Sequence, residues 1–107
     1  MPKKMKTKLV EINDIKIRQH GEKKEIISDQ INKYEMDLKI LIKDRDDSLL
    51  ELKDIHISNT ERENLVKYHK DLIENKKKSI KLLQDDYDLY ERKICYRTKI
   101  KEKKNKN

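Results

Sequence analysis

Two long stretches of the chain carry a seven-residue repeat of apolar residues, and this repeat restricts the folds open to it. In residues 27–55 and 66–97 the repeat positions are spaced alternately three and four residues apart. Such spacing puts them on one stripe of an α-helix and is typical of coiled coils. The stripes contain Ile27, Ile31, Tyr34, Leu38, Leu41, Arg45, Ser48, Leu52 and Ile55, and then Val66, His69, Ile73, Lys76, Ile80, Leu83, Tyr87, Tyr90, Ile94 and Arg97. We therefore expect two long helices whose stripes pack together as a coiled-coil seam, formed mainly by Ile27, Ile31, Tyr34, Leu38, Leu41, Ile80, Leu83, Tyr87, Tyr90 and Ile94.

The composition favours long helices over a sheet. A sheet-rich fold needs turns, and turns use clusters of Gly, Pro and Asn. The 107 residues include one Gly and one Pro, while 46% of them are charged and 34% are hydrophobic. High charge with a helical repeat is typical of helices that have a narrow apolar face. The length suits one small domain, so we predict a single all-α domain over residues 1–107.

A helix-start signal in the middle of the chain predicts that the chain folds back on itself. Thr60 with Glu63 fits a capping box, and so does Ser58 with Glu61, two residues earlier. The β-branched segment at residues 55–57 is poor at continuing a helix. We predict an antiparallel two-helix hairpin, with helix 1 over about 8–56, a turn at 57–60 and helix 2 over about 61–103. The turn and cap residues are Ser58, Asn59, Thr60 and Glu63. A single very long helix in an oligomeric coil is the alternative.

The two stripes suggest one register for this hairpin. If Ile55 faces Val66, the numbers of facing residues sum to 121, and antiparallel pairing keeps that sum. Tyr34 then faces Tyr87, and five successive layers between residues 27–41 and 80–94 are mainly apolar. The basic seam positions also coincide, with Arg45 opposite Lys76 and Lys24 opposite Arg97. We expect these basic side chains to extend toward nearby carboxylates.

The second helix has more apolar residues than its seam uses. They form a neighbouring stripe of Leu65, Tyr68, Leu72, Leu82, Leu89 and Tyr96. An exposed apolar stripe indicates a partner. The alternative is internal cover by a short third helical segment at residues 9–20, where Leu9, Ile12 and Ile15 have helical spacing and Gly21 ends the helix.

The net charge of +7 is concentrated at the ends of the chain. Residues 1–10 carry four lysines and no acid, and residues 92–107 carry eight basic residues against Glu102. Residues 11–91 hold 16 basic and 20 acidic groups. Basic ends can attract nucleic acid, an anionic membrane or an acidic protein surface, or they can simply be solvated tails.

Several classes of protein are not expected from this sequence. Its longest apolar run, Ile40-Leu41-Ile42, is too short for a transmembrane helix, and no signal-peptide core is present. His20, His56 and His69 lack ligand spacing, and we interpret His69 as a polar seam residue. Cys95 is interpreted as a structural thiol in a reducing compartment. We predict no enzyme activity, no catalytic residue, no metal site and no cofactor.

The second half of the chain resembles the stalk proteins of type III secretion and flagellar export, the FliJ/YscO family. The resemblance lies in ISNTERENLVKYHKDLIENKKKSIKLLQDDYDLYERKICYRTKIKEKK, residues 57–104, which has a polar cap, a long arm, late aromatics and a basic end. It implies a central stalk that couples a hexameric export ATPase to the inner-membrane export gate, with secretion chaperones as further candidate partners. The protein would act at the cytoplasmic face of that membrane.

The resemblance also implies where each partner would bind. The basic end would enter the ATPase pore through Lys3, Lys4, Lys6, Lys8, Arg92, Lys93, Arg97, Lys99 and Lys101. The turn and the apolar stripe would meet the export gate.

Two other functions stay open. One is a folding chaperone that resembles tubulin-binding cofactor A, a three-helix bundle that needs a helix break near Gly21. The other is a basic helical protein that binds nucleic acid, with an affinity that falls steeply with salt. The acidic body of the chain and its few arginines make nucleic acid the less expected partner.

Overall fold

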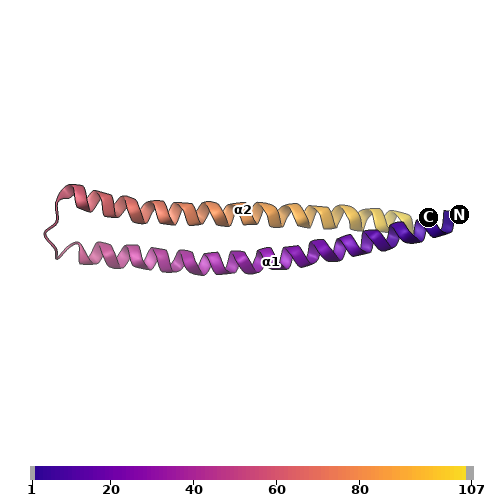
Figure 1. Cartoon of the computed structure of the whole chain (residues 1–107), viewed down its shortest axis with the longest axis horizontal. Helices are drawn as coiled ribbons and strands as arrows, with labels where there is room; N and C mark the ends of the chain where they lie inside the picture. Colours follow the sequence, from indigo (N-terminus) through magenta and orange to yellow (C-terminus); the bar gives the residue numbers. More distant parts are fainter. Residues whose placement is uncertain (1, 106–107) are drawn as a thin grey trace. The chain divides into compact units, whose positions relative to one another are not determined.

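The fold is a helical hairpin, as the sequence predicts. The computed structural model describes the backbone of residues 2–105 and the side chains of residues 10–100. Helix α1 spans Pro2–Glu51 and helix α2 spans Asn59–Asn105, joined by a short non-helical connection (Figure 1). Residues 2–105 contain no β-strand. The choice between a hairpin and one uninterrupted helix is thereby settled for the hairpin.

The chain divides into two compact units, and each contains a segment of both helices. The terminal unit comprises residues 1–29 and 84–107, and the turn unit comprises residues 30–83. The first includes both ends of the chain, and the second includes the connection between the helices.

Helix α1 does not break at Gly21. The glycine lies inside the 50-residue helix, and no glycine in the described residues has a positive φ. One glycine costs a helix interior only about 1 kcal/mol relative to alanine, which α1 tolerates. Ile12 and Ile15 belong to this same helix and remain 48% and 43% exposed. Residues 9–20 therefore extend helix 1 and are not a third segment that covers helix 2; the side chain of Leu9 lies outside the described residues.

The turn lies earlier in the chain than the predicted boundaries. Helix α1 ends at Glu51, not near residue 56, and α2 begins at Asn59. Ser58 is the N-cap, because its Oγ accepts a hydrogen bond of 3.2 Å from the backbone N–H of Glu61. Helix α2 therefore starts at the earlier of the two predicted N-caps, and Thr60 lies within α2.

The end of α1 is stabilised by short-range bonds and by α2. The amides of Lys53 and Asp54 each donate to the carbonyl three residues before them, at 3.2 Å, which tightens the last turn. The Arg62 guanidinium donates to the carbonyl oxygen of Leu52 at 3.2 Å. A carbonyl that the helix end leaves without an intrahelical partner is thereby satisfied.

The predicted stripes are the most buried positions of the turn unit. Leu52, Ile73 and Ile80 are 8%, 5% and 7% exposed, and they form the core of the described residues. Most other seam positions of this unit are half-buried. Near the connection the seam fails, because Ile55 is 52% exposed and Val66 is 43% exposed. The predicted seam is therefore present, but it opens at the end next to the turn.

The predicted register of the seam is wrong. In the terminal unit, Asn13 contacts Arg97, His20 contacts Tyr90 and Lys24 contacts Glu91. The residue numbers of these pairs add up to between 110 and 115. In the turn unit, Lys76 contacts Tyr34 and Asp37, and Arg62 contacts Leu52. The residue numbers of these pairs add up to between 110 and 114. The prediction was 121. Because α1 ends at Glu51 and α2 begins at Asn59, each α2 residue faces an α1 residue that lies earlier in the chain than predicted.

The observed register also removes an electrostatic conflict. The predicted register faced Arg45 with Lys76 and Lys24 with Arg97, and like charges at short range repel. Lys76 instead contacts Tyr34, and Lys24 contacts Tyr87. Arg97 is hydrogen-bonded to Asn13. The basic seam residues thus meet aromatic or polar groups.

Candidate interaction surfaces

The two lysines of the seam have matching environments, one in each unit. In the turn unit, Lys76 Nζ lies 4.4 Å from the centre of the Tyr34 ring and 3.6 Å from a carboxylate oxygen of Asp37. In the terminal unit, Lys24 Nζ lies 4.8 Å from the centre of the Tyr87 ring and 3.6 Å from a Glu91 carboxylate oxygen. Each ammonium group thus has one aromatic face and one carboxylate within cation–π and ion-pair range.

These contacts alter the proton affinity of Lys24. Desolvation would lower the pKa of its ammonium group, but hydrogen bonding and attraction to Tyr87 and Glu91 outweigh it and raise the pKa. The lysine therefore stays charged and acts as a structural cation in the seam.

His20 occupies a seam position of the terminal unit. Its ring centre lies 5.6 Å from that of Tyr90. Burial lowers the pKa of His20, and the positive charges of Lys93, Arg97, Lys23 and Lys16 lower it further. Its buried Nδ1 has no hydrogen-bond partner among the residues that the structure describes. The surroundings of His20 therefore favour the neutral imidazole.

The basic residues assigned to ATPase binding all belong to the terminal unit. Arg92, Lys93 and Lys99 are exposed. Arg92 donates to the Asp88 carbonyl at 3.4 Å, and Lys93 lies 5.0 Å from the centre of the Tyr90 ring. Arg97 is half-buried and serves the fold through Asn13. The side chains of Lys3, Lys4, Lys6, Lys8 and Lys101 lie outside the described residues.

The apolar stripe predicted on helix 2 is largely exposed. In the turn unit, Leu65, Tyr68 and Leu82 are 40%, 58% and 67% exposed, and Leu72 is half-buried. In the terminal unit, Leu89 and Tyr96 are 44% and 67% exposed. Within residues 10–100, then, this stripe has no internal cover of the kind that a third helical segment would give.

Helix α1 also exposes apolar side chains, and of these only Ile12 and Ile15 were considered from the sequence, as part of a covering segment. Ile12 and Ile26 in the terminal unit are 48% and 58% exposed, and Met36 and Ile40 in the turn unit are 65% and 58% exposed. Ile12, Ile26 and Ile40 are separated by multiples of seven residues, so the heptad repeat could have revealed them as a second stripe.

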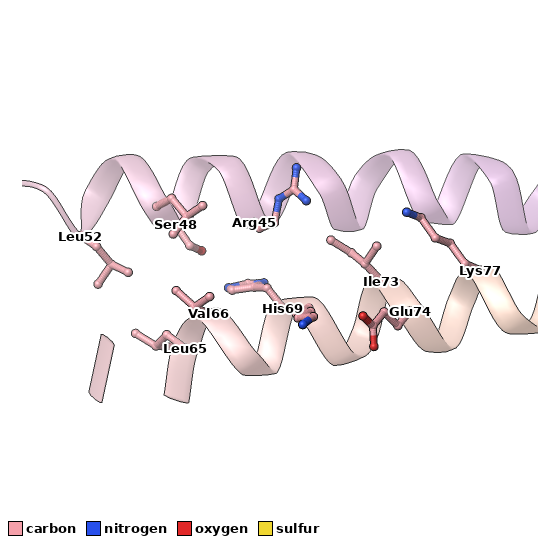
Figure 2. A pocket seen from close by; sticks show the side chains of 11 residues that line it. Arg45, Ser48, Leu52, Leu65, Val66, His69, Ile73, Glu74 and Lys77 are labelled. Carbon is pink, nitrogen blue, oxygen red and sulfur yellow. The ribbon is translucent and has the colours of Figure 1, made fainter. Parts of the chain in front are cut away.

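The turn unit contains a groove that the sequence did not predict. It has a volume of about 310 Å³ and lies between the two helices where the seam opens (Figure 2). Leu52, Val66 and Ile73 give it apolar walls, and Arg45, Lys70 and Lys77 contribute cationic groups. No sequence signal could have located it, because it depends on where the connection holds the two helices.

The described residues contain neither a metal-binding cluster nor a membrane-spanning helix. Among the described residues, no three side chains of His, Cys, Asp or Glu come together as a group that could hold a metal ion. No helix in that part of the chain is both long enough and apolar enough to span a membrane. Cys95 is exposed and has a free thiol.

Comparisons with known proteins give no further guide. No protein-family model matches the chain. No curated protein and no solved structure matches it either.

Proposed function

We propose that the chain is a non-catalytic docking protein, and specifically the central stalk of a type III secretion export apparatus. In this role it couples a hexameric export ATPase to the inner-membrane export gate, at the cytoplasmic face of that membrane. The coarser statement, a helical hairpin that works through protein contacts, is supported by the fold and by the exposed apolar stripes. The finer one depends on the resemblance to the export stalk proteins.

The observation that carries the proposal is the collection of basic residues in one unit. Both ends of the chain belong to the terminal unit, which contains 16 basic and ten acidic residues, a net charge of +6. The turn unit contains 12 basic and 11 acidic residues, a net charge of +1. A unit with this excess charge attracts an acidic protein surface, and the proposal is that the ATPase pore presents such a surface.

The test is a binding measurement with the purified hexameric export ATPase of the same cell. Reversing charge at Arg92, Lys93 and Lys99, which are exposed, should weaken binding by about tenfold or more, because interface charges steer and hold the complex. Arg97 is left unchanged because it supports the fold. A matched variant reverses the exposed Lys33, Lys53 and Lys67 of the turn unit and should bind as the wild type does.

Two results would overturn the stalk role. One is that the wild type does not bind the ATPase; the other is that both triple variants lose affinity equally. Recovery of tubulin as the main partner from the native host would favour the folding chaperone instead. The continuity of α1 through Gly21 weighs against that reading, since the chaperone's three-helix bundle needs a break there. Binding to nucleic acid that falls steeply with salt would favour the third function.

A further inference from the structure

The groove of the turn unit is an unfilled part of the coiled-coil seam. Val66 and Ile73 occupy equivalent heptad positions on α2, seven residues apart. Ile73 is 5% exposed, whereas Val66 is 43% exposed although both line the groove. In a continuous seam each such position is covered by the facing helix. Figure 2 shows Val66, Leu65 and Leu52 around the gap between the helices.

The apolar lining of the groove includes more residues than Leu52, Val66 and Ile73. Leu49 of α1 and Leu65 of α2 also line it, and they are 39% and 40% exposed. The volume of about 310 Å³ lies at the lower end of the range of about 300–1,000 Å³ typical of ligand pockets. A groove of this size between two helices suits a few large apolar side chains on one face of a third helix.

The charged groups around the groove indicate which charges a bound helix would carry. Arg45, Lys70 and Lys77 line it, against the single carboxylate of Glu74. The Arg45 guanidinium is paired with Asp46 at 3.0 Å, whereas Lys70 and Lys77 are exposed. A groove with an apolar lining and exposed cations beside it is complementary to a helix whose apolar stripe is flanked by carboxylates.

We propose that this groove is the docking site for an amphipathic helix of a partner protein, with large apolar residues on one face and acidic residues beside them. The apolar residues would cover Val66 and Leu65, and the carboxylates would pair with Lys70 and Lys77. The occupant would complete the open seam as a local three-helix packing. Leu65 also belongs to the apolar stripe that the stalk role assigns to the export gate. The groove residues lie in the turn unit and the predicted ATPase site lies in the terminal unit, so the two proposals are tested separately.

The test uses a fluorescent peptide of about 20 residues, with Leu at the a and d positions of a heptad repeat and Glu at the flanking positions. Its affinity for the full-length chain is measured by fluorescence anisotropy. We expect saturable binding, and almost none for the same peptide with Lys in place of Glu. The paired change Lys70→Glu with Lys77→Glu should weaken binding by about tenfold or more, and Val66→Glu should weaken it similarly.

The control is the pair Lys78→Glu with Lys81→Glu. Both lysines are exposed on α2 and neither lines the groove, so this pair makes the same change in net charge and should keep wild-type affinity. Equal loss in both pairs would mean non-specific attraction to a basic protein and would overturn the proposal. So would a failure of the wild type to bind. Sedimentation velocity gives a third outcome: a wild-type dimer that Val66→Glu dissolves would make a second copy of the chain the occupant and would also overturn it.

Discussion

Asn13 and Arg97 lie 84 residues apart in the sequence and hydrogen-bond each other in both directions. The Arg97 guanidinium donates to Asn13 Oδ1 at 3.1 Å, and the Asn13 side-chain amide donates to the Arg97 carbonyl at 3.2 Å. Both residues are half-buried in the terminal unit. The pair therefore ties the first part of α1 to the last part of α2, inside the unit that contains both ends of the chain.

Replacing Asn13 by alanine should destabilise this unit. The change removes two hydrogen bonds, one of them to a charged group, and leaves the Arg97 guanidinium without its acceptor. We expect a loss of about 1–3 kcal/mol. Hydrogen exchange of the terminal-unit amides measures it locally. The exposed Gln19→Ala change on the same helix is the control, and equal protection in both variants would show that the pair contributes nothing.

The register can be tested with cysteine pairs that share one position. In a Cys95→Ser background, Lys76→Cys is combined with Tyr34→Cys, which follows the observed contact, or with Arg45→Cys, which follows the register predicted from sequence. The two α1 positions lie 11 residues apart, about 16 Å along the helix. A short bifunctional maleimide should cross-link the first pair readily and the second pair poorly. Efficient cross-linking of the second pair alone would restore the register with the sum of 121.

Alanine substitutions at Ser58 and Thr60 test which of the two residues caps α2. Ser58→Ala should destabilise the turn unit by about 1 kcal/mol, because the Glu61 amide loses the acceptor that it has in the Ser58 hydroxyl. Thr60→Ala places alanine within the helix, where it is favoured, and should be neutral or slightly stabilising. Thermal unfolding followed by circular dichroism measures both changes. The opposite order of stabilities would assign the cap to Thr60.

The heptad spacing predicted two long helices, and the helix-start signal near residue 60 predicted that they form a hairpin, but neither predicted its details. Each stripe is set by residues on one helix, so Ile73 and Ile80 could be recognised as seam residues from their spacing alone. The register depends on where both helices end, and two overlapping capping boxes left the start of α2 uncertain. The end of α1 at Glu51 has no strong local signal in the sequence. Both helix boundaries were therefore predicted too late in the chain, and the two errors together shifted the predicted register. The contact of Lys76 with Tyr34 and the groove beside Val66 follow from that register and that turn, and neither could be predicted.

The protonation of His20 should make the terminal unit sensitive to acid. Burial and the neighbouring positive charges lower the pKa of His20 below its ordinary 6.5 in the folded chain. As the pH falls below 6.5, the unfolded chain takes up a proton that the folded His20 resists, so the free energy of unfolding decreases. Above that range both states hold a neutral imidazole, and this contribution is constant.

The measurement is the melting temperature at pH 7.5 and at pH 5.5, for the wild type and for His20→Leu. We expect the wild type to lose a few degrees more than the variant between these two values, because leucine fills the seam position without taking up a proton. His56→Gln removes an exposed histidine of the connection and is the control for the loss of one histidine elsewhere. If His20→Leu and the wild type lose the same number of degrees, acid sensitivity comes from groups other than His20.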